Sequence, residues 1–161
     1  MFLIFSCENQ SNSIVVEDRT FQKLDKNLSI KLNSQWVKDE AFRIEQYCIR
    51  QGWKTKSTNS GLQYVVIEDL HNNNSPKAGD QVIISYDVRL MNPEKTSCYH
   101  SDSNGLAKFT IDQSSVESGL HEVVTYLNKG DSALVILPHY LAHGITGDSH
   151  KIPPLSSVIY Y

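Results

Sequence analysis

The sequence predicts a protein of the α+β class, in which an antiparallel sheet packs on one short helix. Three observations support this fold class. Apolar residues recur at helical spacings of three and four before residue 52, and they alternate along short segments after it. A further helical stripe interrupts the alternating segments at residues 116–128. Strands, one short helix and more strands, in that order, are typical of a sheet with a helix on one face.

Residues 16–52 are predicted to form two helices outside the sheet. The first carries an apolar stripe of Phe21, Leu24, Leu28 and Leu32. The second begins near Asn33 or Ser34, either of which can cap a helix, and it ends at Gly52. The apolar stripe of this second helix consists of Val37, Ala41, Ile44 and Cys48. We therefore expect Cys48 to pack in the core as a small apolar side chain.

The predicted strands begin at residue 53. Two short strands, at 53–56 and 62–67, are joined by STNSG, a turn sequence typical of a hairpin. The segment VIISYDVRL at 82–90 alternates and is rich in β-branched residues, so it is predicted to be one strand. SDSNG at 101–105 is predicted to be a loop. The remaining predicted strands lie at residues 108–112, 133–137 and 158–161.

The composition is that of one globular domain with a modest extension. The chain has 161 residues, of which 40% are hydrophobic and 20% are charged. A net charge of −3 gives no electrostatic reason to expect nucleic acid as a partner. The three cysteines form neither a disulfide framework nor a zinc motif, and no metal site is expected. His139 and His143 are four residues apart, but no third ligand accompanies them.

The N-terminal residues MFLIFSC resemble the lipobox of bacterial lipoproteins, whose cysteine is acylated. Ile4 and Ser6 fit this pattern, whereas Phe5 fits poorly and the apolar run is shorter than a signal peptide. Two interpretations stay open. Either Cys7 is lipidated and residues 8–15 form a polar tether, or this is an ordinary apolar N-terminus with a free thiol.

A proline- and glycine-containing loop, LPHYLAHGITGDSHKIPP, occupies residues 137–154 between two predicted strands. Pro153 and Pro154 fix their own φ angles and remove two backbone donors, so the segment is neither a helix nor a central strand. We predict a rigid, shaped loop, and loops of this kind commonly line a binding site.

Three segments together resemble the FKBP-type peptidyl-prolyl isomerases: VIISYDVRL, VESGLHEVVTYLNKGD and ILPHYLAHGITGDSHKIPP. The resemblance covers residues 77–161 most closely and rests on Gly119, Gly130, Ala142, Gly144, Gly147 and Ile152-Pro-Pro. It implies an FKBP-like domain at 53–161, with a twisted antiparallel sheet wrapped around the short helix. The loop would be the flap over a proline-binding pocket, and no cofactor would be needed.

The helical N-terminal segment, running into TNSGLQYVVI, is similar to that of bacterial, envelope-attached members of the family. With YDVRL and the lipobox-like start, it resembles the gliding-motility-associated isomerase lipoproteins of Bacteroidetes. This likeness implies a protein anchored by lipid at Cys7 in the bacterial cell envelope, in the periplasm or at the outer membrane. Its partners would be proline-containing polypeptides, and its role would be to assist their folding.

The resemblance also assigns roles to individual residues. Tyr86, Tyr99 and His143 would be catalytic, because they occupy polar pocket positions. The implied substrate-binding residues are Cys98, Phe109, Val116, Glu117, Leu120, Ile152 and Tyr160. Packing in a core alone would also bury most of these apolar residues, so a purely structural role is the alternative.

Three departures from the family pattern bear on activity. Cys98 and Tyr99 stand where the family has a Phe-Asp pair, so the usual pocket carboxylate is absent. His143 replaces the flap tyrosine, whose hydroxyl is a hydrogen-bond donor. Glu117 replaces an isoleucine whose family contact is mainly through its backbone N–H. We therefore expect weak isomerase activity, and the alternative is a catalytically inactive module that binds proline-containing segments.

Overall fold

The computed structural model describes the backbone of residues 18–161 and the side chains from residue 26 onwards. It contains two compact units, one ending at Val37 and the other comprising Lys38–Tyr161. Cys7 and the predicted tether at 8–15 lie outside the described residues. No helix in the described part of the chain is long and apolar enough to cross a membrane.

Helix α1 runs from Asp18 to Gln51 as a single element of 34 residues. The prediction of two helices separated near Asn33 and Ser34 was therefore wrong. Both residues are good helix caps, but neither contains the backbone restriction of proline or the flexibility of glycine. In a helix interior they cost only a fraction of a kcal/mol each, about 0.5 kcal/mol relative to alanine, so the helix continues through them.

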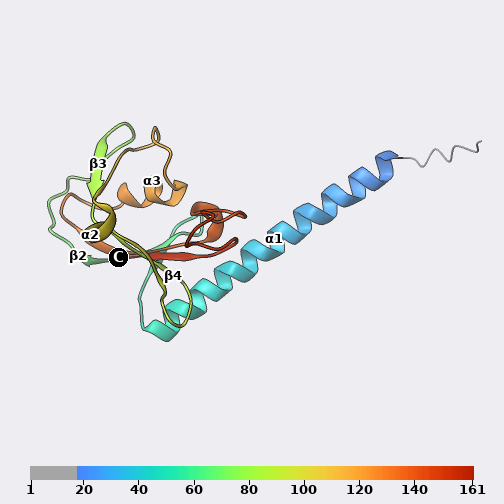
Figure 1. Cartoon of the computed structure of the whole chain (residues 1–161), viewed down its shortest axis with the longest axis horizontal. Helices are drawn as coiled ribbons and strands as arrows, with labels where there is room; N and C mark the ends of the chain where they lie inside the picture. The colour runs from blue at the N-terminus through green and yellow to red at the C-terminus, as the bar shows by residue number, and fades with distance from the viewer. Residues whose placement is uncertain (1–17) are drawn as a thin grey trace, which may run out of the picture. The chain divides into compact units, whose positions relative to one another are not determined.

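Six strands form the larger sheet, in which all neighbouring strands are antiparallel (Figure 1). Their spatial order is β1 (Lys56–Ser57), β2 (Gln63–Glu68), β7 (Ser132–Leu137), β8 (Val158–Tyr160), β4 (Asp87–Leu90) and β5 (Ser97–His100). A second, two-stranded sheet pairs β3 (Gln81–Ile84) with β6 (Ala107–Thr110). The α+β class and the antiparallel sheet are as the sequence predicts.

The segment 82–90 is divided between the two sheets, so the prediction of one continuous strand was wrong. It bends at Ser85 and Tyr86, which lie between β3 and β4. Ser101 stabilises the bend, because its backbone N–H donates to the Tyr86 carbonyl at 2.9 Å and its hydroxyl lies 2.9 Å from the Ser85 hydroxyl. Ser101 begins the one-turn helix α2 (Ser101–Asn104), where the sequence predicted only a loop. Strand alternation does not reveal where a strand passes from one sheet to another.

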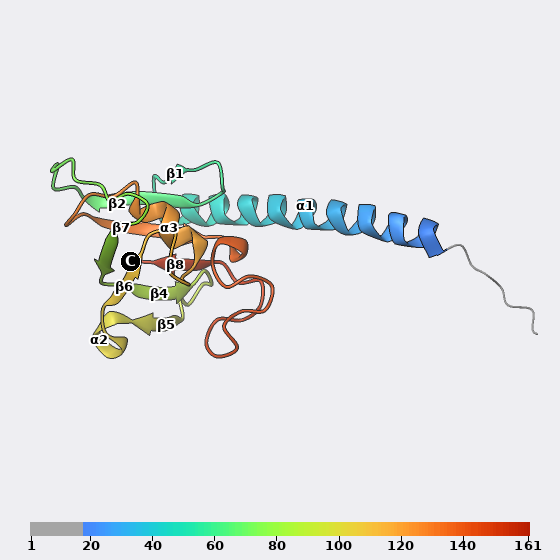
Figure 2. The ribbon, with the colours of Figure 1, turned by 90° about the horizontal axis from the view of Figure 1, so that it is seen from above.

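Helix α3 (Ser118–Val124) lies over one face of the larger sheet (Figure 2). Its residues Leu120, Val123 and Val124 are buried in the main core. Gly119 allows its close approach to the sheet, because a Cβ atom there would lie 2.5 Å from Leu137 Cδ2. The helix is shorter than the predicted 116–128, since the Thr125 amide already bonds to the carbonyl of Glu122 rather than four residues back.

The larger sheet is buried on both faces in its centre. Along β7, Val135 and Leu137 belong to the main core with α3, whereas Leu134 and Ile136 belong to a second core. This alternation is the strand period of two. The second core also contains residues of the C-terminal part of α1, namely Ile44, Tyr47 and Cys48. Cys48 is therefore a core residue, as predicted.

Candidate functional site

The residues that the sequence assigned to a pocket come together around the main core. Five of them are buried there: Cys98, Phe109, Leu120, Ile152 and Tyr160. Tyr86, Tyr99 and Val116 are partly buried and pack against the same cluster. They come from three strands, the bend, α3, the segment before it and the loop at 137–154, so only the tertiary fold brings them together.

The polar part of this site is a contact between Glu117, His143 and Tyr160. Glu117 directly precedes α3, His143 lies in the loop at 137–154, and Tyr160 lies on β8. The Nε2 atom of His143 is 3.0 Å from Oε1 of Glu117, and the Tyr160 hydroxyl donates to the same oxygen at 3.0 Å. A carboxylate is thus present in the site, supplied by a residue for which the sequence predicted mainly a backbone contact.

Electrostatics favours a charged pair at this point. Burial alone would raise the pKa of Glu117, but hydrogen bonds from His143, from its own backbone amide and from Tyr160 lower the pKa below its ordinary value. The hydrogen bond to Glu117 raises the pKa of His143, against the opposing effect of burial. Burial and the nearby carboxylate raise the pKa of Tyr160, so its hydroxyl remains a donor. All three donors therefore converge on one carboxylate.

Tyr99 contacts the flap loop through Asp148. Its hydroxyl donates to Oδ2 of Asp148, while Oδ1 accepts from the backbone amides of His150 and Ile152 at 2.9 and 2.8 Å. The hydrogen bond to Asp148 raises the pKa of Tyr99 to about 12. Lys151 adds a second contact, because its Nζ atom lies 5.0 Å from the centre of the Tyr99 ring. The Tyr99 hydroxyl thus fixes the loop instead of being a free pocket group.

The loop itself has a geometry that requires glycine at one point. Gly147 has a φ of +68°, and a Cβ atom there would lie 2.2 Å from the carbonyl oxygen of Ile152. The Asp148 amide donates to the same carbonyl at 3.1 Å, which closes a tight turn. Asp148 was not among the predicted site residues. The sequence could indicate the turn, because an Asp side chain commonly accepts from the backbone amide two residues later. The sequence gives no signal for the contact between Asp148 and Tyr99.

Comparison with known proteins identifies the family. The model of the FKBP-type peptidyl-prolyl cis-trans isomerases matches residues 72–161, which is more than half of the chain. The chain belongs to this family. Membership supports a peptidyl-prolyl isomerase role for the FKBP-type domain.

A solved structure shares the fold. The crystal structure of FkpA from Escherichia coli matches with a TM-score of 0.61 and a sequence identity of 24%. The match covers 91% of this chain and 70% of FkpA. At this identity the likeness establishes the fold, and it extends beyond the FKBP-type domain into the preceding residues.

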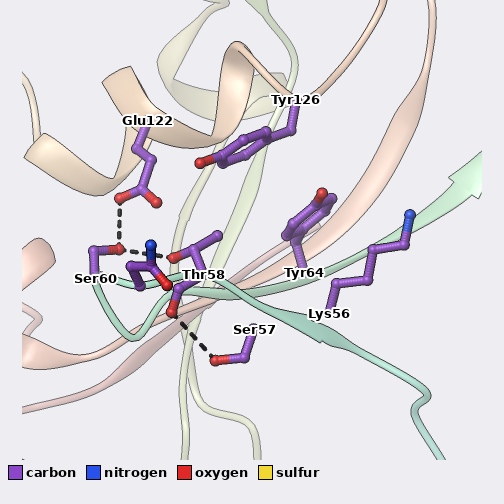
Figure 3. Close-up of a pocket in the computed structure, with 8 residues that line it drawn as sticks. Lys56, Ser57, Thr58, Ser60, Tyr64, Glu122 and Tyr126 are labelled. Carbon is purple, nitrogen blue, oxygen red and sulfur yellow. Dashed lines mark hydrogen bonds between the residues drawn. The ribbon is translucent and has the colours of Figure 1, made fainter.

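A surface hollow lies between the turn at residues 57–60 and the residues Glu122 and Tyr126 (Figure 3). The stacked rings of Tyr64 and Tyr126, with centroids 5.4 Å apart, form one wall. Opposite them, the Ser60 hydroxyl donates to Glu122 of α3 at 2.6 Å. None of the predicted site residues lines this hollow. Its turn, residues 57–61, is nevertheless connected to the flap loop at 137–154 by the hydrogen bond between Tyr140 and Ser60.

The site contains no group suited to covalent catalysis. Burial raises the pKa of the Cys98 thiol, which disfavours the thiolate that a nucleophile requires. Among the described residues, no group of three His, Cys, Asp or Glu side chains is arranged to hold a metal ion. His139 instead contacts Glu40 of α1. What the arrangement offers is an apolar, largely buried cluster with a few hydrogen-bond donors.

Proposed function

We propose that this protein accelerates cis–trans isomerisation of Xaa-Pro bonds in protein clients, with low turnover, at the apolar cluster that contains Tyr86, Val116, Leu120, Ile152 and Tyr160. Rotation about the bond faces a barrier of about 18–20 kcal/mol, set by amide resonance. Resonance places negative charge on the carbonyl oxygen, and water stabilises that charge. An apolar surface removes this water and so favours the twisted transition state, in which the resonance is lost.

The observation that carries the proposal is the convergence of these residues on one cluster within the segment that matches the family. Desolvation needs apolar walls and no reactive group, and this site provides that combination. As an imidazolium, His143 has two N–H donors, one of which contacts Glu117. We propose that, in exchange for Glu117, His143 donates to a substrate carbonyl outside the rotating bond and so holds the peptide at the apolar cluster.

Low turnover follows from the position of Glu117. Its carboxylate accepts from His143, Tyr160 and its own backbone amide. A substrate carbonyl needs donors at the same place, so it competes with an acceptor that is already bound. A carboxylate is the stronger acceptor, because hydrogen bonds to charged groups are worth roughly twice as much as neutral ones.

The experiment is a proline-isomerisation assay on the full chain with a series of Xaa-Pro peptides, with Ile145→Ala as a control on an exposed flap residue. We expect a measurable acceleration that depends on the preceding residue and is lost in His143→Leu. Acceleration that persists unchanged in His143→Leu would contradict the role given to this residue.

A second candidate function is supported by the same contacts. Tyr99 is engaged with Asp148, and His143 with Glu117, so few donors are free for catalysis. The protein would then bind proline-containing segments without isomerising them. Saturable binding of proline peptides, with no acceleration at any protein concentration, would favour this binding module over the enzyme.

We also propose a cellular context for the isomerase. The lipobox-like residues Ile4, Ser6 and Cys7 and the polar segment 8–15 support lipidation at Cys7 and anchoring in the bacterial cell envelope. The likeness of the N-terminal segment to gliding-motility-associated lipoproteins of Bacteroidetes supports a role in folding envelope proteins of that machinery. Mass spectrometry of the native N-terminus tests this proposal. A chain that starts at Met1 with an unmodified Cys7 thiol would overturn it.

A further inference from the structure

Glu40 is a buried carboxylate on α1, outside the segment that matches the family. Only 2% of its surface is exposed. Its Oε1 atom accepts from the backbone amide of His139 at 2.8 Å and from the hydroxyl of Ser157 at 2.6 Å, and its Oε2 atom lies 2.5 Å from Nδ1 of His139. A carboxylate removed from water is costly unless such partners satisfy it, so this arrangement is specific. The sequence gives one signal for it, since a charged residue interrupts the apolar face that carries Val37 and Ile44.

The partner of Glu40 is the first residue after strand β7 that has a backbone N–H to donate. Strand β7 ends at Leu137, Pro138 has no N–H, and His139 begins the short helix η1 (His139–Leu141). The carbonyl of His139 accepts from Ala142 at 3.1 Å and from Gly144 at 2.7 Å. These two amides flank His143, which contacts Glu117 in the site. The residue whose amide Glu40 binds therefore also anchors, through its carbonyl, the two amides on either side of His143.

A second contact holds the next residue of the loop. The hydroxyl of Tyr140 donates to the carbonyl of Ser60 at 3.0 Å. Ser60 lies in the turn that borders the hollow of Figure 3, next to Gly61. A Cβ atom at Gly61 would lie 2.4 Å from the Tyr140 hydroxyl, so the turn leaves space for this contact. Both contacts come from residues that precede the family match, which begins at residue 72.

We infer that Glu40 is a positioning residue for the isomerase site, because it fixes the start of the flap loop and thereby the place of His143, with Tyr140 and Ser60 as a second support. This inference rests on the proposed function. It assigns to the segment 38–61 a part in the activity of the FKBP-type domain that follows it. A misplacement of about 1 Å in a catalytic group can reduce a rate by about a hundredfold.

The experiment compares Glu40→Ala with two controls in the full chain. Glu45→Ala makes the same change at an exposed position of the same helix. Ser157→Ala removes a hydrogen bond to the same carboxylate, donated by the residue that precedes β8, and leaves the contact with His139 intact. For each variant, kcat and KM for an Xaa-Pro peptide and amide hydrogen exchange of residues 141–144 are measured at a temperature where the chain is folded.

We expect Glu40→Ala to lower kcat/KM by about tenfold or more and to accelerate exchange in the flap, while β7 and β8 keep their protection. Glu40→Gln retains an acceptor oxygen and is expected to restore most of the activity. Ser157→Ala should lose stability but retain activity and flap protection. Activity that falls equally in Ser157→Ala and Glu40→Ala would assign Glu40 a purely structural role and overturn the inference.

Two further measurements separate the possible failures. If Glu40→Ala does not fold, Tyr140→Phe tests the second support by removing one hydroxyl. Unchanged flap exchange in that variant would overturn the inference. If the wild-type chain shows no isomerase activity, the proposed function fails, but the exchange measurements still decide whether Glu40 positions the flap.

Discussion

Replacing Glu117 with isoleucine is expected to increase isomerase activity, although it removes two hydrogen bonds from the site. In the wild-type chain, the carboxylate accepts from His143 and Tyr160, each at 3.0 Å. A substrate carbonyl that takes over these donors exchanges bonds to a charged acceptor for bonds to a neutral one. Bonds to charged groups contribute about 1.5–3 kcal/mol and neutral bonds about 0.5–1.5 kcal/mol. The competition therefore costs about 1 kcal/mol per donor.

Two donors together give about 2 kcal/mol, which corresponds to roughly a 30-fold effect. Because Glu117 and His143 keep some contact with water, we expect a smaller effect, an increase of about tenfold in kcat/KM for Glu117→Ile. Glu117→Gln keeps the acceptor oxygen without its charge and should give an intermediate value. The assay is proline isomerisation under conditions where circular dichroism shows the variants folded. A kcat/KM that stays the same or falls in a folded Glu117→Ile variant would refute the competition.

Three other perturbations test the remaining contacts. Tyr99→Asp, which on the family pattern alone should restore activity, is instead expected to place a second carboxylate beside Asp148 and to weaken the flap. Amide exchange at His150 and Ile152 should be faster in Tyr99→Asp than in Tyr99→Phe. Higher turnover of Tyr99→Asp with unchanged exchange would contradict the predicted weakening of the flap. The pair of Glu117 and His143 should give a stability optimum in pH, measured as Tm against His143→Phe. The raised pKa of His143 stabilises the fold fully at pH values below its unfolded pKa of 6.5, and this stabilisation is lost as the pH rises through the folded pKa. The lowered pKa of Glu117 stabilises the fold fully at pH values above its unfolded pKa of 4.5, and this stabilisation is lost as the pH falls through the folded pKa. Both contributions are complete between pH 4.5 and pH 6.5, so the Tm should be highest there. If the wild-type Tm varies with pH no more than the Tm of His143→Phe, the charged pair of Glu117 and His143 does not contribute to stability. Finally, Gly147→Ala should destabilise the chain by at least about 1 kcal/mol more than Gly144→Ala, because both have positive φ but only Gly147 faces a carbonyl at 2.2 Å. Equal denaturation midpoints for the two would contradict this.

The sequence predicts the local parts of the fold well, because they depend on local periodicity. Strand β7 and the apolar face of α3 follow the alternation and the helical spacing of their own residues. The division of residues 82–90 between two sheets does not, since it depends on contacts of Ser85 and Tyr86 with Ser101. Likewise, nothing local distinguishes Asn33 and Ser34 in a helix interior from the same residues as caps.

The polar contacts of the site were the least predictable part. The sequence brings Tyr160 and His143 into the site through the family pattern, and it assigns Glu117 a contact that is mainly through the backbone. The contact of Tyr99 with Asp148 joins residues 49 positions apart, and that of Glu40 with His139 joins residues 99 positions apart. Residue pairs this far apart in the sequence leave no local sequence pattern. They can be identified only once the tertiary fold has brought the two residues together.

These contacts together indicate a flap that is held before any substrate arrives. Glu40 fixes its start through His139, Glu117 holds its middle through His143, and Tyr99 fixes its far side through Asp148. A loop with three such supports cannot open widely without breaking several of them, each of which involves a carboxylate. Opening is therefore an expensive way to admit a substrate, whereas exchange of one acceptor at His143 breaks only the middle support. For this reason we expect the carboxylate of Glu117, and not the motion of the flap, to determine how fast the site accepts a prolyl bond.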